Sequence, residues 1–176
     1  GSGTITANFV DNVAPITSAS ITSGTSGNNG WYTSSSVELT LTATDPEPTS
    51  GVASITYSLD SGVPITVSGS SVVIVISGDA VHSLTYYSFD NAGNQELSKN
   101  FAVKIDSTAP SISGGATSSP NGNGWWNSSV LVHFVGSDDT SGVASVAPDV
   151  MVSTEGFNQT VTGTVTDLAG NSASLT

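Results

Sequence analysis

The chain of 176 residues contains no cysteine, so neither disulfide bonds nor thiolate metal ligands take part in its structure. Basic residues are almost as scarce: 2 lysines and arginines stand against 14 aspartates and glutamates, for a formal net charge of −12. Such a chain has no basic patch with which to bind nucleic acid or anionic lipid. Its longest apolar run, residues 72–76, is far shorter than the roughly 20 residues of a membrane-spanning helix. We therefore expect no nucleic-acid partner and no membrane insertion, and the acidity fits either cation binding or solubility alone.

What the sequence does contain is typical of an all-β protein: 19 glycines, many serines and threonines, and short stretches rich in Val and Ile. Residues 37–43 alternate apolar and polar side chains with a period of two, which indicates a half-buried strand. Clusters of Gly, Pro, Asn and Asp separate the candidate strands, and no segment sustains a helical period. Further strands are expected at residues 54–59, 72–77, 83–89, 101–105 and 130–134.

Four short signatures occur twice in the same order, with the second set beginning about 95 residues after the first. They are Asp-x-x-Ala-Pro from Asp11 and Asp106, Gly-Trp-aromatic from Gly30 and Gly124, Ser-Gly-Val-Ala-Ser from Ser50 and Ser141, and Asp-x-Ala-Gly-Asn from Asp90 and Asp167. This period is too long for one turn of a solenoid and suits a small β domain. The duplication predicts two tandem β-sandwich domains.

We place the first domain at residues 11–105 and the second at residues 106–176. Residues 1–10 then form either the end of a preceding repeat or a first strand. The second domain is shorter, and the missing stretch corresponds to residues 57–67, so we expect it to lack a strand or to pair it differently. We also expect its last strand to be truncated. Because the chain starts and stops within the pattern, we interpret it as a segment of a longer protein.

The second domain carries Asp-Ser-Thr-Ala-Pro (106–110), Asn-Gly-Trp-Trp-Asn (123–127), Ser-Asp-Asp-Thr-Ser-Gly-Val-Ala (137–144) and Asp-Leu-Ala-Gly-Asn (167–171). This ordered set resembles the bacterial immunoglobulin-like (Big-type) repeat modules of large extracellular and cell-surface proteins. The resemblance implies two tandem immunoglobulin-like domains, an extracellular or cell-surface location, and a spacer, stalk or adhesion role beside neighbouring repeats of the same polypeptide. The first domain departs from the pattern in its longer middle.

Acidic residues fall in loops that an immunoglobulin-like topology brings to one pole of each domain. They are Asp11, Asp45, Glu47 and Asp90 in the first domain, and Asp106, Asp138, Asp139 and Asp167 in the second. Crowded carboxylates repel one another, and a set of oxygen ligands without His or Cys selects Ca²⁺. The alternative is that these side chains only cap the turns in which they stand and that the protein has no cofactor.

Two aromatic pairs, Trp31-Tyr32 and Trp125-Trp126, follow Asn-Gly turns. Neighbouring residues of a strand point to opposite faces, so we expect one member of each pair to be buried and the other to face solvent. An exposed member would stack on a sugar ring, which makes a polysaccharide or another cell-surface ligand a candidate partner. The alternative is that both members only pack against the end of the domain.

The sequence offers no catalytic constellation. His82 and His133 fall in different domains without a recurring partner, and His133 is expected to point outward from its strand. No Gly-x-Ser-x-Gly motif occurs. We therefore expect a protein that is not an enzyme: a spacer, stalk or adhesion module of a larger secreted or surface-anchored bacterial protein, with Ca²⁺ as a candidate stiffening ion. A carbohydrate-binding module is the alternative.

Overall fold

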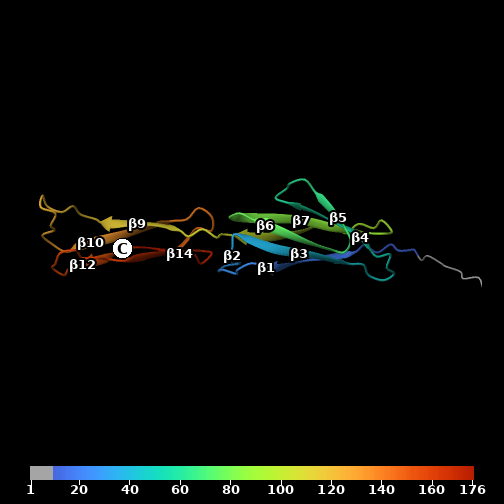
Figure 1. Cartoon of the computed structure of the whole chain (residues 1–176), viewed down its shortest axis with the longest axis horizontal. Helices are drawn as coiled ribbons and strands as arrows, with labels where there is room; N and C mark the ends of the chain where they lie inside the picture. Colours follow the sequence, from blue (N-terminus) through green and yellow to red (C-terminus); the bar gives the residue numbers. More distant parts are fainter. Residues whose placement is uncertain (1–9) are drawn as a thin grey trace, which may run out of the picture. The chain divides into compact units, whose positions relative to one another are not determined.

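A computed structural model describes residues 10–176, and all the regular structure in that part of the chain is β (Figure 1). The all-β prediction is therefore confirmed. The strands are β1 (Ile16–Ser23), β2 (Trp31–Tyr32), β3 (Ser36–Thr44), β4 (Val52–Leu59), β5 (Ile65–Ser68), β6 (Ser71–Ser77), β7 (Ala80–Asp90), β8 (Lys99–Ile105), β9 (Ser111–Ala116), β10 (Val130–Ser137), β11 (Val143–Val146), β12 (Val150–Val152), β13 (Gly163–Asp167) and β14 (Ser172–Leu175).

Each of the six strands expected in the described residues is present, with ends that differ by a few residues. The possible strand before residue 10 lies outside the described residues. The other eight strands, β1, β2, β5, β9 and β11–β14, lie outside the expected ranges. Among them, β2 and β5 have only 2 and 4 residues. A period of two cannot be recognised over so few positions.

The strands before residue 106 form two sheets, in the orders β1-β3-β6 and β2-β8-β7-β4-β5. β3 shows why its sequence forms a strand: Val37, Leu39, Leu41 and Ala43 are all buried, and the residues between them face outward or lie half-buried. The neighbouring strands β1 and β6 both pair with β3 in antiparallel register. The buried face of this sheet is therefore one continuous apolar surface.

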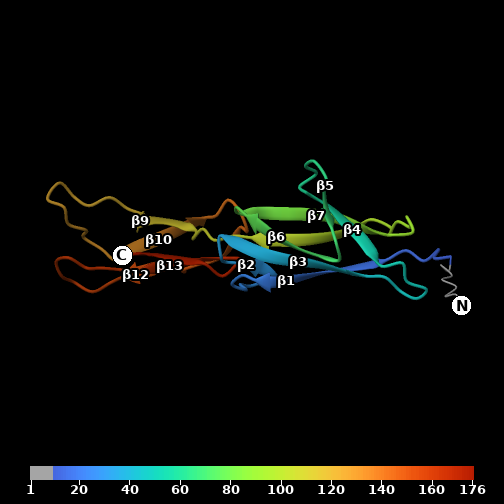
Figure 2. The same cartoon turned by 45° about the vertical axis from the view of Figure 1, so that its right-hand side comes forward.

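The second of these sheets, β2-β8-β7-β4-β5, also buries apolar side chains. The fully or almost fully buried members are Ile55, Leu84, Tyr86, Val103 and Ile105. Each such side chain contributes about 1.5–3 kcal/mol when it is removed from water. Figure 2 shows the strands in two layers, with β3 and β1 on one side and β7 and β4 on the other.

The strands after residue 106 form the sheets β12-β10-β9 and β11-β13-β14. Phe134 of β10 is buried between glycines of two neighbouring strands. A Cβ atom added to Gly114 of β9 would lie 2.6 Å from the Phe134 ring, and one added to Gly163 of β13 would also collide with that ring. Only glycine therefore allows the two sheets to approach this closely around a phenylalanine.

The second pair of sheets has no counterpart of the β4–β5 hairpin among residues 143–167. β5 pairs with β4, whereas β12 pairs with β10, in the way that β6 pairs with β3. The missing hairpin agrees with the prediction that the shorter half lacks a strand. The described chain is thus a layered, sandwich-like all-β protein.

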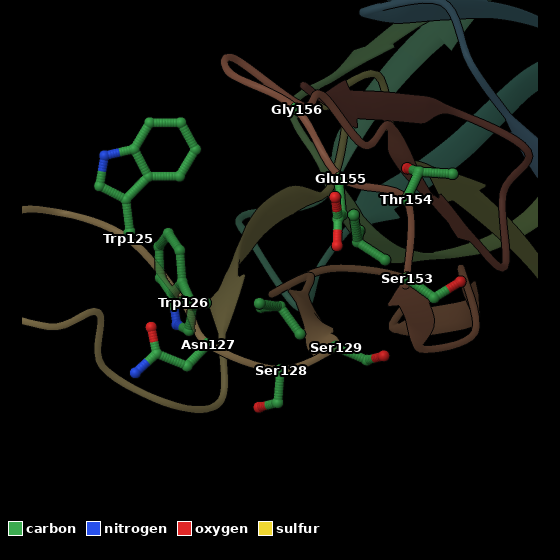
Figure 3. A pocket seen from close by; sticks show the side chains of 11 residues that line it. Trp125, Trp126, Asn127, Ser128, Ser129, Ser153, Thr154, Glu155 and Gly156 are labelled. Carbon is green, nitrogen blue, oxygen red and sulfur yellow. The ribbon is translucent and has the colours of Figure 1, made fainter.

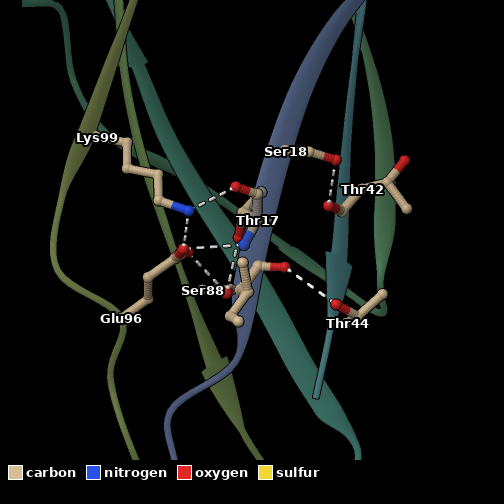
Figure 4. Close-up of polar contacts among 8 residues, drawn as sticks. Thr17, Ser18, Thr42, Thr44, Ser88, Glu96 and Lys99 are labelled. Atoms are coloured by element: carbon tan, nitrogen blue, oxygen red, sulfur yellow. Dashed lines mark hydrogen bonds and ion pairs between the residues drawn. The ribbon is translucent and has the colours of Figure 1, made fainter. Parts of the chain in front are cut away.

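Polar side chains also join the two layers that contain β1 and β7 (Figure 4). Glu96 is only 7% exposed, and its Oε1 accepts hydrogen bonds from the Thr17 backbone N at 2.8 Å and from Lys99 Nζ at 2.5 Å. Ser88 Oγ donates to Glu96 Oε2 at 3.1 Å and accepts from Thr17 Oγ1 at 2.8 Å. We call these four residues the Glu96 network; it fixes the start of β1.

β6 is an edge strand of its sheet. Its inward-facing Ile74 and Ile76 are buried, while Val73 and Val75 on the other face are 57% and 61% exposed. The strand contains neither a charged residue nor a proline. This edge therefore lacks the side chains by which many proteins prevent edge-to-edge pairing.

The described residues divide into two compact units: residues 10–24, 36–77 and 81–103 in the first, and residues 25–35, 78–80 and 104–176 in the second. The second unit thus includes two short segments that precede residue 104. The domain limits at residues 11–105 and 106–176 remain a prediction. Within the described residues, no helix is long and apolar enough to cross a membrane.

Candidate functional site

Three acidic residues that are far apart in sequence meet in the first unit. Asp11 precedes β1, Asp45 follows β3, and Asp90 ends β7. One carboxylate oxygen from each of them lies within 4.8 Å of those of the other two. We call this group the first carboxylate cluster. Two oxygen ligands of the same Ca²⁺ ion are at most about 5 Å apart, so the spacing fits a single ion.

Backbone amides hold the members of this cluster in place. Asp11 accepts hydrogen bonds from the backbone N of Val13 at 3.0 Å and of Ser50 at 2.8 Å. The hydrogen bond from the Val13 amide is the main reason that the pKa of Asp11 lies below its ordinary value. Asp45 Oδ2 accepts from the backbone N of Gly51 at 2.7 Å, but Asp45 Oδ1 is buried and has no hydrogen-bond partner. One buried acceptor of the cluster is therefore unsatisfied.

The second unit contains a matching group of Asp106, Asp138 and Asp167, again with one oxygen from each within 4.8 Å of the others. This is the second carboxylate cluster. Asp106 is 0% exposed and Asp167 is 1% exposed. The amides correspond as well: Ser141 N donates to Asp106 at 3.1 Å, and Gly142 N donates to Asp138 at 2.6 Å. The six aspartates therefore form two groups of the same design.

Neither cluster has a cationic side chain to balance its charge. The chain has only two lysines and no arginine besides. Lys99 is paired with Glu96, and the Nζ of Lys104 lies over the ring of Trp31, 5.8 Å from its centroid. Buried carboxylates that lack a counter-ion are costly, because burial removes the water that would otherwise solvate the charge. A bound cation would remove this cost.

Glu47 and Asp139 were also predicted as metal ligands, but the structure does not bring either of them into a cluster. Both side chains are exposed. Glu47 is two residues from Asp45, and Asp139 is next to Asp138, but neither belongs to the cluster of its neighbour. The sequence alone could not distinguish these neighbours, because only the local direction of the loop decides which carboxylate faces the pole.

The two histidines each have an acidic partner that sequence analysis missed. His82 Nδ1 lies 2.8 Å from Asp60 Oδ2, and His133 Nδ1 lies 2.7 Å from Asp149 Oδ1. The hydrogen bond with His82 is the first reason that the pKa of Asp60 is lowered. His82 is buried, whereas the side chain of His133 is 54% exposed, as the alternation of its strand predicts.

The aromatic pairs follow the prediction only in part. Trp31 is 8% exposed and Tyr32 is half-buried. Trp125 and Trp126, however, are 50% and 40% exposed, so the prediction that one of them is buried is wrong. The reason is that β2 gives Trp31 and Tyr32 a strand neighbour, whereas Trp125 and Trp126 lie in a loop where alternation between two faces does not apply.

The exposed tryptophans border a hollow of about 560 Å³ (Figure 3). Its lining is mostly polar apart from the indoles, with Ser153, Thr154 and Glu155 on the side opposite Trp126. The Nε1 of Trp126 donates a hydrogen bond to the Ser118 carbonyl at 3.1 Å, which fixes that indole. Indole faces together with hydroxyl and carboxylate groups are the surfaces on which sugar rings stack and form hydrogen bonds.

No model of a known protein family matches the chain, and a comparison with curated proteins finds no significant match to it.

Proposed function

We propose that this chain is a non-catalytic spacer, stalk or adhesion module of a larger secreted or surface-anchored bacterial protein, and that its carboxylate clusters bind Ca²⁺. The main support is the pair of matched clusters. Each joins three separate segments of the chain through side chains that have oxygen ligands only. Calcium sites of extracellular modules have dissociation constants of about 10⁻⁴–10⁻³ M, and we propose an affinity in this range for the clusters.

Binding of an ion would stiffen each pole of the protein. Asp11, Asp45 and Asp90 stand on three different segments, so one ion would link these segments and cancel the repulsion among them. The unsatisfied Asp45 Oδ1 would gain a partner. If the dissociation constant is on the order of 0.1 mM, 1 mM calcium stabilises the folded state by about 1.4 kcal/mol per site.

The calcium proposal is tested by thermal unfolding in 1 mM CaCl₂ and in a chelator. A gain of this size raises the melting temperature by about 3–6 °C in a protein of this length. Asp138→Asn keeps the acceptor for the Gly142 amide but removes a charge from the second cluster, and it should abolish the response of that site. Asp139→Asn is the matched control, because Asp139 lies outside the cluster. Identical melting curves with calcium and with chelator would exclude this ion.

The spacer role has its own test. We expect an elongated profile in small-angle X-ray scattering and no binding to a panel of glycans. Neighbouring modules of the same polypeptide are then the main partners. A compact scattering profile together with saturable glycan binding would contradict the spacer role.

A carbohydrate-binding module is the second candidate, and the hollow beside Trp125 and Trp126 supports it. On this proposal, saturable binding to a polysaccharide should be lost in Trp125→Ala and in Trp126→Ala. Glu155→Gln should weaken it less. Phe157 is 78% exposed, and its ring centroid lies 6.1 Å from that of Trp125, so Phe157→Ala would also reduce the aromatic surface. Binding that survives both tryptophan substitutions would exclude this site.

A further inference from the structure

The exposed aromatic residues of the described chain gather beside one hollow. Trp125 and Trp126 line it and are 50% and 40% exposed, and Phe157, which follows the lining residue Gly156, is 78% exposed. The other aromatic side chains within residues 10–176 are buried or half-buried. We call this hollow, together with Trp125, Trp126, Glu155 and Phe157, the indole hollow. Exposed apolar groups that lie together, unlike single ones, mark binding sites.

The rings of the indole hollow are spaced so that one cation can contact two of them. Trp125 and Phe157 have ring centroids 6.1 Å apart, with their planes inclined at 41°. A cation is attracted to an aromatic face when it lies within about 6 Å of the ring centroid, and Trp is the strongest partner. A position between these two rings satisfies this distance for both. Trp126 adds an aromatic surface and no free donor, because its Nε1 already donates to the Ser118 carbonyl.

The indole hollow carries a negative charge that nothing in the chain neutralises. Glu155 is the one ionisable residue among those that line it, and its carboxylate lies on the side opposite Trp126 (Figure 3). Within the part of the chain that the structure describes, no hydrogen bond or ion pair engages this carboxylate. Residues 105–176 contain no lysine or arginine. An anionic ligand is therefore disfavoured, and a cationic one is favoured.

The chain itself shows what such a ligand would do. The Nζ of Lys104 lies over the indole of Trp31, 5.8 Å from its centroid. Trp31 and Trp125 have the same place in the repeated Gly-Trp signature. The other lysine, Lys99, is held in an ion pair elsewhere. No lysine or arginine of the described residues is thus left for Trp125 or its neighbour, and a cation over these rings must come from a bound molecule.

We propose that the indole hollow is a binding site for a quaternary ammonium group, the cation of choline. Such a group has no N–H donor to leave unpaired, and its methyl groups contact the aromatic rings while the Glu155 carboxylate balances its charge. The hollow has a volume of about 560 Å³, which is within the range of small-molecule sites. The inference goes beyond the spacer function and does not depend on calcium.

The same cation occurs free in choline, beside a phosphate in phosphocholine, and in the headgroup of phosphatidylcholine. A phosphate would meet no lysine or arginine of residues 105–176 and would be repelled by Glu155. We therefore expect choline to bind more tightly than phosphocholine. Vesicles of phosphatidylcholine should not retain the protein in a flotation assay.

The test is an NMR titration of the isotope-labelled chain with choline chloride, in a chelator and about 0.15 M NaCl to screen long-range attraction. The chain has three tryptophans, so each gives one indole N–H signal. Trp125→Phe and Trp126→Phe assign these signals. Choline should shift the signals of Trp125 and Trp126 saturably. The signal of Trp31, which is only 8% exposed, should stay in place as an internal control.

Two controls separate charge from shape. The neutral alcohol in which carbon replaces the nitrogen of choline should bind at least about fivefold more weakly, the ratio expected from one cation–π contact. Glu155→Gln should weaken choline binding about 2–5-fold and leave binding of the neutral alcohol unchanged. Glu47→Gln is the matched variant, because Glu47 is exposed and lies in the first unit. It should leave the affinity for choline unchanged.

Equal affinities for choline and the neutral alcohol would overturn the proposal, as would equal effects of Glu155→Gln and Glu47→Gln. Signals of Trp125 and Trp126 that do not move in about 0.1 M choline would also overturn it. Tighter binding of phosphocholine, or retention by the vesicles, would reject the choice of ligand. Shifts caused by a neutral oligosaccharide but not by choline would reject the proposal and support the carbohydrate-binding module. The spacer function is judged separately by scattering, so it stands when this site fails.

Discussion

Removal of the Glu96 carboxylate is the most direct test of how the two layers are held together. The Thr17 amide donates to this carboxylate at 2.8 Å in a site where the Glu96 side chain is only 7% exposed (Figure 4). Glu96→Ala leaves this amide and the Ser88 hydroxyl without an acceptor and leaves Lys99 without its ion pair. Breaking a buried pair from one side costs about 3–5 kcal/mol. Because the Lys99 side chain is 39% exposed and can regain water, we expect about 3 kcal/mol.

Glu96→Gln separates charge from hydrogen bonding. Its carbonyl can still accept from the Thr17 amide, so only the charge interaction with Lys99 and the bond from Ser88 are weakened. We expect a loss of about 1.5–2 kcal/mol in the free energy of unfolding, measured by urea denaturation. Lys99→Met and the variant that combines Glu96→Gln with Lys99→Met complete a double-mutant cycle. The coupling free energy between Glu96 and Lys99 should be about 1–2 kcal/mol.

The pH dependence of the free energy of unfolding provides an independent check on the Glu96 network. Burial alone would raise the pKa of Glu96, but the hydrogen bonds from Lys99 and Thr17 outweigh it and hold the pKa below its ordinary value of 4.5. A lowered pKa stabilises the fold above pH 4.5, and this contribution is lost as the pH falls through the folded-state value. A Glu96→Ala variant that loses less than 1 kcal/mol at neutral pH would refute the reasoning.

Two further predictions concern other parts of the fold. Gly163→Ala should lower the free energy of unfolding by about 1–3 kcal/mol in urea denaturation, because the new methyl group collides with Phe134. Thr164→Ala, which changes an exposed neighbour, is its control and should cost much less. Asp60→Asn should lower stability by less than about 1 kcal/mol at pH 7, since the pair with His82 is partly exposed. The difference between Asp60→Asn and the parent should shrink as the pH falls below 3.8, because the lowered pKa of Asp60 stabilises the fold only above it.

The strands could be predicted from the sequence where alternation extends over enough residues. β3 shows four buried apolar side chains at every second position, and its limits were found to within one residue. The convergence of Asp11, Asp45 and Asp90 was also predictable, because topology alone brings their loops to one pole. Which loops meet at one pole depends on where the strands end. The turn residues between strands mark these ends in the sequence.

What could not be predicted depends on contacts between particular side chains. Trp125 and Trp126 follow the same letters as Trp31 and Tyr32, yet their exposure differs because only the first pair has a strand beside it. The pairing of His133 with Asp149 joins β10 to a turn 16 residues away, and no local pattern announces it. Similar sequence in these two stretches therefore predicts neither the same backbone conformation nor the same neighbours.

The negative net charge of this protein also bears on the exposed edge strand β6. A strand that presents two valines outward and carries no lysine, proline or acid of its own has nothing local to prevent it from joining the strand of another molecule. Long-range repulsion between molecules that each carry a charge of −12 supplies that protection instead. Protection against edge-to-edge pairing thus comes from the charge of the whole surface and not from the side chains of β6. Bound calcium would stiffen the fold, but it would also reduce the negative charge and so weaken the repulsion between molecules.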